Sequence, residues 1–143
     1  MSLIELQGVH KGFGPQQVLR GVDISIEKGQ TVVIIGGSGT GKSVTLKLII
    51  GLLRPDQGEV IFDGRNWRSF DLASADRERT RFGYVFQGGA LFDSLNILEN
   101  VAFPLREHTR KKEDEIRDIV ERCLLSVGLT NVSHKFPSEL SGG

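Results

Sequence analysis

The sequence predicts an α/β fold in which a parallel core sheet is flanked by helices. Residues 31–35 are a continuous β-branched run between glycines, which is typical of a strand buried on both faces of a parallel sheet. A glycine-rich stretch at 36–43 follows, and apolar residues then recur at helical spacing over 46–53. The order strand, loop, helix therefore places a strand of the core sheet directly before a helix.

The composition favours one compact domain and excludes several classes of protein. Of the 143 residues, 38% are hydrophobic and 25% are charged, as in ordinary globular domains. Lys plus Arg and Asp plus Glu both number 18, so bulk charge does not support a nucleic-acid partner. A single cysteine excludes an internal disulfide framework, and the longest apolar stretch, 46–53, is too short to cross a bilayer. We therefore expect a cytoplasmic protein that works at a membrane only through other subunits.

Two N-terminal segments have the pattern of half-buried strands. Residues 3–9 and 22–26 alternate apolar with polar side chains, and in the second segment the even positions are apolar. Glycine-containing turns at 11–15 and 27–30 separate these strands from each other and from the run that follows. The sequence thus predicts two strands with one apolar face each ahead of the buried strand.

The later elements follow in order along the chain. Residues 59–63 predict a strand, 69–81 contain a short helix, and 82–86 are a second candidate for a buried strand. A final helix is predicted by an apolar stripe that ends at Gly128. The stripe consists of Ile116, Ile119, Val120, Cys123, Leu124 and Val127. We expect Cys123 to be a small buried core residue of this stripe.

A phosphate-binding loop is predicted between the buried strand and the helix. It consists of Gly36, Gly37, Ser38, Gly39, Thr40, Gly41, Lys42 and Ser43. The glycines let successive backbone N–H groups turn toward a phosphate, and the helix adds its positive N-terminal end. Lys42 would reach the β- and γ-phosphates, and the Ser43 hydroxyl would ligate Mg²⁺. The alternative is a glycine-rich turn that happens to precede a helix, which requires motif, strand and helix to coincide by chance.

Four features in this order resemble the nucleotide-binding domain of the ABC ATPases. They are Phe13 after the first strand, the loop 36–43, Gln87 after the second buried run, and the terminal Leu-Ser-Gly-Gly at 140–143. The resemblance implies a P-loop NTPase of ABC type, in which the parallel core sheet is joined by an antiparallel β subdomain and the start of a helical subdomain. It divides the chain into an ATP-binding core with the β subdomain, 1–87, and a helical subdomain, 88–143.

The resemblance also assigns roles to single residues. Phe13 would stack on the adenine of ATP, and Gln87 would approach Mg²⁺ and its water and report the nucleotide state to a membrane subunit. Val44 and Thr45 continue the loop beside the α-phosphate; Val44 departs from the family's usual Ser or Thr, but its backbone N–H serves equally. The opening of the signature motif, at the nucleotide of a second copy, would be Ser141, Gly142 and Gly143. From the residues alone, Phe13 could instead fill the core, and Gln87 could be an ordinary polar strand-end residue.

A finer resemblance concerns residues 88–109 and 137–140, which are similar to the ATPase of the MCE-linked, Mla-type phospholipid-transport systems. It implies phospholipid transport across or between bacterial envelope membranes and an integral membrane permease that docks between Gln87 and Pro104 on the inner face of the cell membrane. Four apolar residues lie there: Leu91, Phe92, Leu95 and Ile97. An exposed apolar surface would indicate a partner, whereas buried side chains would build the subdomain's own core. Another ABC importer is the alternative.

The family's hydrolytic residues are absent from these 143 residues. The resemblance places an Asp for Mg²⁺, a Glu that orients the attacking water and a His at the γ-phosphate beyond Gly143. The runs 31–35 and 82–86 would then have open edges. We expect a fragment of a longer protein in which two copies sandwich two ATP molecules, while the fragment itself is a non-catalytic domain that binds nucleotide at most. A soluble ABC-type ATPase of DNA repair or translation is disfavoured by the balanced charge.

Overall fold

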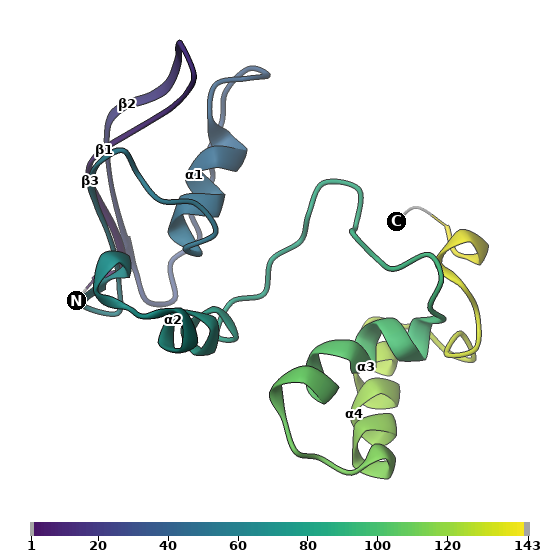
Figure 1. Ribbon diagram of the computed structural model, residues 1–143. Coiled ribbons are helices and arrows are strands. Elements are labelled where there is room, and N and C mark those ends of the chain that lie inside the picture. The colour runs from purple at the N-terminus through teal and green to yellow at the C-terminus, as the bar shows by residue number, and fades with distance from the viewer. Residues whose placement is uncertain (1, 142–143) are drawn as a thin grey trace. The chain divides into compact units, whose positions relative to one another are not determined.

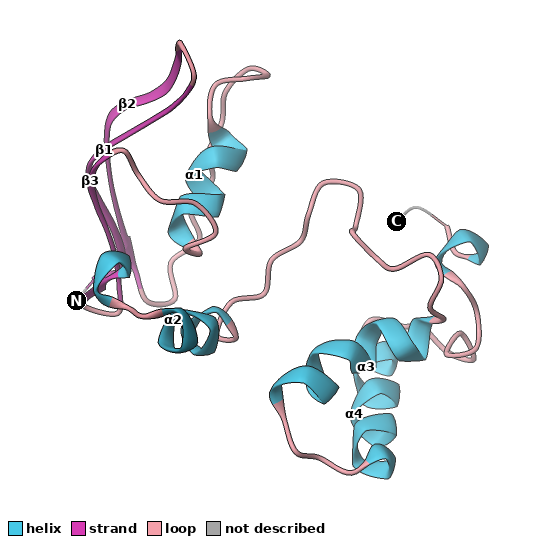
Figure 2. Ribbon diagram, in the orientation of Figure 1, coloured by secondary structure: helices cyan, strands magenta, loops and turns pink. Residues whose placement is uncertain are grey.

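The computed structural model describes residues 2–141. The chain forms two compact units, Met1–Gly83 and Tyr84–Gly143 (Figure 1). The β-strands belong to the first unit, whereas the second unit is helical (Figure 2). Each unit buries apolar side chains of its own.

An antiparallel four-stranded sheet is the framework of the first unit. Its order is β2-β1-β3-β4, with β1 at Ser2–Phe13, β2 at Gln16–Glu27, β3 at Gln57–Phe62 and β4 at Arg65–Asn66. β1 and β2 form a hairpin whose register shifts at several points, and both strands extend beyond the predicted segments. The predicted alternation in β2 is confirmed, because its apolar residues at 22, 24 and 26 are half-buried and the polar residues between them are exposed.

The helix α1 spans Lys42–Ile49, directly after the glycine-rich loop, and contacts β3. Gly51 follows the helix with a φ of 69°, a left-handed conformation that glycine adopts without strain. The segment 69–81, predicted to hold a short helix, contains α2, Leu72–Arg79, and η1 at Trp67–Ser69 comes directly before it. The core between sheet and helices includes Leu6, Val9, Leu19, Leu48, Ile49, Val60 and Phe62.

The two segments predicted as buried strands of a parallel sheet are not strands. Residues 31–35 and 82–86 have no strand structure, and Ile35 and Val85 are 90% and 88% exposed. The strands within residues 2–141 pair only antiparallel, and neither segment joins them. A buried strand needs hydrogen-bonding neighbours and covered faces, and the described residues supply no sheet neighbour for either run. For these two segments the prediction of buried strands is wrong.

Two helices dominate the second unit. α3 spans Ile97–His108 and α4 spans Glu113–Ser126, and a short η2 follows at Pro137–Glu139. Asn96 begins α3 with a capping box, in which its side chain accepts from the Glu99 amide at 2.9 Å and the Glu99 carboxylate accepts from the Asn96 amide at 3.0 Å. The core of this unit comprises Ile97, Ala102, Ile116, Val120, Leu124 and Val132.

The predicted apolar stripe of α4 is confirmed only in part. Ile116, Val120 and Leu124 are buried, whereas Cys123 and Val127 are exposed. The small core of the second unit covers about one side chain per turn of α4, and Cys123 lies beside that line. The prediction that Cys123 is a buried core residue is therefore wrong.

Candidate nucleotide-binding site

The glycine-rich loop turns sharply before α1 and is packed against β2. Gly39 and Gly41 have φ values of 78° and 95°, which favour glycine. A Cβ on Gly41 would lie 2.7 Å from Cδ2 of Leu19 and 2.9 Å from Cγ1 of Val18. Only glycine therefore lets the start of α1 approach the sheet this closely.

Two side chains tie the loop to itself. Lys42 Nζ donates to the carbonyl oxygens of Gly36 at 2.7 Å and Gly37 at 2.5 Å. The Thr40 hydroxyl donates to the same Gly37 oxygen at 2.9 Å. A Cβ on Gly36 would lie 2.7 Å from Oγ1 of Thr40, so any other residue there would displace the Thr40 side chain. The result is a closed loop that carries the positive charge of Lys42.

The first turn of α1 presents backbone donors at the end of this loop. The first N–H groups of an α-helix have no intrahelical acceptor and carry the positive end of the helix dipole. Ser43 is exposed here, and Val44 is half-buried. Thr45 is buried, and its hydroxyl donates to the Gly41 oxygen at 3.0 Å. The loop and helix start thus bring together a lysine cation, free amides and an exposed hydroxyl, which is a set suited to an anion with a bound cation.

Phe13 lies at the tip of the β1–β2 hairpin and is 48% exposed, which excludes the alternative that it is a buried core residue. The ammonium of Lys11 lies 5.5 Å from the centroid of its ring. Asp56 anchors this region, since its carboxylate accepts from Lys11 Nζ at 2.7 Å and from the Gly12 amide at 2.7 Å. The hydrogen bond from Lys11, followed by that from Gly12, lowers the pKa of the Asp56 carboxyl below its ordinary value. Phe13 is thus an exposed aromatic ring on an anchored hairpin.

The remaining predicted site residues belong to the second unit. Gln87 is exposed and precedes Gly88 and Gly89, whose φ values are 90° and 83°. Ser141 is exposed as well, and Leu140 packs against the helical core. Gly142 and Gly143 lie outside the described residues. The structure groups the loop 36–45 in one place, whereas the roles of Gln87 and of the signature stay predictions.

The sequence analysis missed Lys11 and Asp56, which flank Phe13. Lys11 falls in the predicted turn 11–15 and Asp56 was assigned no role, and no local pattern connects the two residues, because they are 45 positions apart in the chain. Only the pairing of β1 with β3 brings the two turns together. Within residues 2–141 no group of three or more His, Cys, Asp or Glu side chains is arranged to hold a metal ion.

Comparison with known proteins decides the family. Residues 19–143 match the family model described as ABC transporter. The chain belongs to the ABC transporter family. Among curated relatives, it is 51% identical over 140 residues to the probable ribonucleotide transport ATP-binding protein mkl of Mycobacterium tuberculosis, covering 98% of this chain and 39% of that protein. It is 42% identical to the intermembrane phospholipid transport system ATP-binding protein MlaF of Haemophilus influenzae, covering 99% of this chain and 54% of that protein.

Solved structures show the fold of this ABC family member. The chain matches the dimeric bacterial ABC transporter cassette MJ0796 with a TM-score of 0.88 at 33% identity, covering 97% of this chain and 63% of that one. A post-hydrolysis dimer of the same cassette, bound to ADP and Pi, matches with a TM-score of 0.86. The chain therefore has the fold of ABC ATPase cassettes. It spans 39% of the mkl length and 54% of the MlaF length. In residues 2–141, every helix is too short or too polar to span a bilayer.

Proposed function

We propose that this chain is the nucleotide-binding part of an ATP-hydrolysing ABC transporter subunit. The observation that carries the proposal is the loop 36–43, closed by Lys42, at the start of α1. A relative of this fold holds ADP and Pi, and it is 33% identical to this chain. The family match and this geometry together support ATP as the ligand.

Each part of the site has a role in holding ATP. The loop amides and the positive end of α1 bind phosphate oxygens, and Lys42 exchanges its bonds to Gly36 and Gly37 for bonds to the β- and γ-phosphates. The exposed hydroxyl of Ser43 is a ligand for Mg²⁺, which in such sites keeps several waters and few protein ligands. Bound Mg²⁺ neutralises charge that develops on the phosphates. Gln87 is the second residue that we propose as a ligand for Mg²⁺.

Adenine is assigned to Phe13. Its exposed ring can stack on a base, and the Lys11 ammonium, which is paired with Asp56, lies 5.5 Å from the ring centroid. The signature residues are proposed to act on a second copy of this domain. The matched cassette is a dimer, which supports a sandwich in which Ser141, Gly142 and Gly143 face the nucleotide of the other copy.

A permease is proposed to dock on the second unit. Leu91 and Phe92 are 50% and 49% exposed, and the Phe92 ring lies 5.1 Å from that of Phe103, which is also exposed. Ile97, in contrast, is buried in the helical core, so the alternative interpretation holds for that residue. Exposed aromatic and aliphatic side chains that gather in one place are typical of protein contacts. Docking there would hold the subunit on the inner face of the membrane.

Phospholipid is the transported substrate that we propose. Relatives at 42% and 37% identity are named intermembrane phospholipid transport system ATP-binding proteins. The relative at 51% identity is named a probable ribonucleotide transport protein, so ribonucleotide is the second candidate. Reconstitution of the intact subunit with its permease in vesicles separates the two. ATP-dependent movement of labelled phospholipid between bilayers supports the proposal, whereas uptake of ribonucleotide without lipid movement contradicts it.

Hydrolysis is tested on the intact, longer protein. Mg²⁺-dependent phosphate release from ATP is expected for the wild type, and Lys42→Ala should lower it by well over about tenfold, or 1.4 kcal/mol of barrier. Lys47→Ala, the same substitution in the same helix, serves as the matched control and should leave the rate close to that of the wild type. Equal rates for wild type and Lys42→Ala would contradict the proposed role of the loop.

A further inference from the structure

The carboxyl end of α1 is held by hydrogen bonds from the turn that follows and from two side chains. The last four carbonyl groups of a helix have no partner within the helix. Two of these are satisfied by the turn that follows: the Gly51 amide donates to the Leu48 oxygen at 3.0 Å. The Leu52 amide donates to the Lys47 oxygen at 2.9 Å, which completes a Schellman motif.

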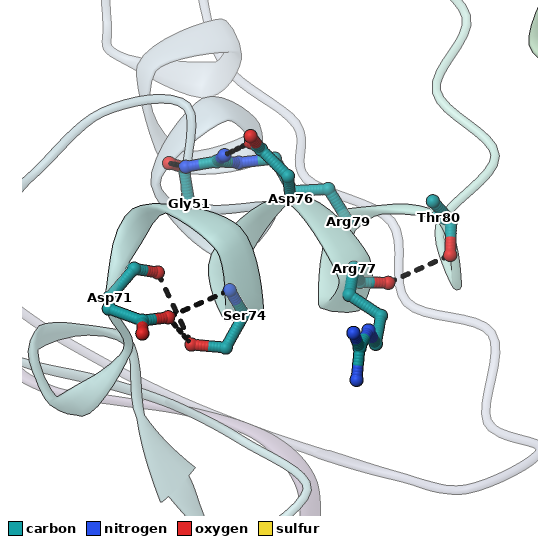
Figure 3. A network of polar contacts seen from close by, with 7 residues as sticks. All are labelled: Gly51, Asp71, Ser74, Asp76, Arg77, Arg79 and Thr80. Atoms are coloured by element: carbon teal, nitrogen blue, oxygen red, sulfur yellow. Dashed lines mark hydrogen bonds and ion pairs between the residues drawn. The ribbon is translucent and has the colours of Figure 1, made fainter. Parts of the chain in front are cut away.

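Two side chains from outside the helix satisfy further carbonyls of this turn. Trp67 Nε1 donates to the Ile49 oxygen at 2.9 Å. Arg79 reaches from α2 and its Nη2 donates to the Gly51 oxygen at 2.8 Å (Figure 3). The Nη1 of Arg79 is paired with Asp76 at 2.5 Å, so the guanidinium is fixed between α2 and the end of α1. A cation at this end also interacts favourably with the negative end of the helix dipole.

The contact between Trp67 and the turn leaves no space for movement. A Cβ on Gly51 would lie 2.8 Å from the indole ring, so the ring rests directly on the turn. The same ring belongs to an aromatic cluster, with centroid distances of 6.0 Å to Phe62 and 5.3 Å to Phe70. The Cζ of Arg79 lies 5.8 Å from the ring centroid. Trp67 therefore contacts both the aromatic cluster and the end of α1.

Arg79 is held in this place at a cost. Its Nε is buried and has no hydrogen-bond partner within residues 2–141. An unpaired buried donor destabilises the fold, so the bonds of the other two guanidinium nitrogens must offset this loss. Arg79 thus keeps its hydrogen bond to the Gly51 oxygen while its own Nε stays without a partner.

The opposite end of the same helix carries the phosphate loop. Eight residues make α1 about 12 Å long, which is short enough to move as a rigid rod. We propose that Trp67 and Arg79 are positioning residues of the phosphate site: they fix α1 along its axis and thereby hold the loop 36–43 in the conformation that receives phosphate. This inference rests on the proposed function, because it takes that loop to be the nucleotide site.

The test uses four variants of the intact protein. Trp67→Phe keeps the ring and removes the donor, Arg79→Met removes the guanidinium, and Arg79→Lys keeps the cation. Arg77→Met is the matched control, because Arg77 is exposed on α2, projects away from Gly51 and makes no side-chain hydrogen bond or ion pair within residues 2–141 (Figure 3). Amide hydrogen exchange of 38–45 and the affinity for ATP are measured for each.

Trp67→Phe and Arg79→Met should each speed exchange within 38–45 and weaken ATP binding by about tenfold, the scale of one lost hydrogen bond at a fixed site. Arg79→Lys should recover part of both effects, and Arg77→Met should show neither. Exchange in β1 and β2 should stay unchanged in all four variants, which verifies that the first unit keeps its fold. If Arg79→Met fails to fold, Trp67→Phe alone still tests whether the end of α1 controls the loop.

Faster exchange confined to 50–82, with 38–45 and the ATP affinity unchanged, would overturn the inference and leave both residues with a packing role only. If the wild type fails to bind ATP, the proposed function is wrong. In that case the exchange rates of 38–45 still show whether Trp67 and Arg79 hold the loop.

Discussion

The two units hold their candidate site residues in different ways. In the first unit, Lys42 and Thr40 tie the phosphate loop to itself, and Gly41 is packed directly against β2. In the second unit, Gln87 is exposed beside two glycines with positive φ, and its side chain makes no hydrogen bond within residues 2–141. The contrast indicates that the glycine-rich loop is held in shape by its own unit, whereas no hydrogen bond within residues 2–141 fixes the Gln87 side chain.

The largest expected effect tests how tightly the loop is packed. Gly41→Ala in the intact protein should abolish ATP binding, because the added Cβ would lie 2.7 Å from Leu19 and the φ of 95° is strained for alanine. Gly39→Ala is the matched control, since its φ is also positive but nothing lies within 4 Å of the added Cβ. Gly39→Ala should lower the free energy of unfolding by only about 1–2 kcal/mol, because the added side chain strains the backbone. Thermal unfolding and ATP titration check both variants. Equal losses of stability and of ATP affinity in the two would show that backbone strain alone matters at this loop.

A smaller effect is expected at Phe13. Phe13→Ala should weaken ATP binding by about 1–3 kcal/mol, the range found for aromatic platforms that stack on bases. Phe13→Tyr and Phe13→Trp keep a stacking surface and should largely preserve binding. Isothermal titration with ATP measures all three. If the three variants behave alike, the ring does not stack on adenine.

A still smaller effect concerns Asp56 and depends on pH. The hydrogen bond from Lys11 lowers the pKa of the Asp56 carboxyl below its ordinary value of 3.8. A carboxyl whose pKa is lowered by folding stabilises the fold above its ordinary value and loses this contribution as pH falls through the lowered one. Asp56→Asn should therefore be less stable than the wild type at neutral pH, and the difference should shrink as pH falls from 3.8 through the lowered pKa. Urea unfolding across this range checks the sign, and a difference that grows toward acid would contradict it.

The smallest effect on nucleotide is expected in the second unit. Phe92→Ala should leave ATP affinity unchanged, because this exposed ring contacts Phe103 and takes no part in the phosphate loop. In vesicles that contain the permease, the same variant should lower ATP-driven transport by severalfold, as expected when an aromatic anchor of an interface is truncated. Leu125→Ala, at an exposed apolar position of α4, is the control. Transport that is equal in both variants would remove Phe92 from the docking surface.

Local patterns were sufficient to predict the elements around the site. The spacing of glycines at 36–41 and the apolar period after Lys42 predicted a loop followed by a helix, and both are present. The alternation in β2 predicted which side chains are half-buried. These features depend on residues a few positions apart, so a single sequence contains the information for them.

Features that depend on distant neighbours were not predicted correctly. The run 31–35 has the composition of a buried strand, but it has no sheet neighbour within residues 2–141 and remains exposed. Cys123 has the helical period of a core residue, but the small second unit does not cover it. The bond from Arg79 to Gly51 spans 28 positions and has no local signal. Periodicity indicates which side chains could be buried, but the tertiary fold determines which of them other residues cover.

The central claim, that the loop 36–43 binds the β- and γ-phosphates of ATP, is tested most directly by a series of ligands. The affinities of the intact protein for ATP, ADP, AMP and adenosine are measured for the wild type and for Lys42→Ala. The account predicts that Lys42→Ala weakens the affinity for ATP and for ADP by about tenfold or more, which is the scale of a lost charge-assisted hydrogen bond. The affinities for AMP and adenosine should stay unchanged. An equal loss for all four ligands, or no loss for any, would contradict it.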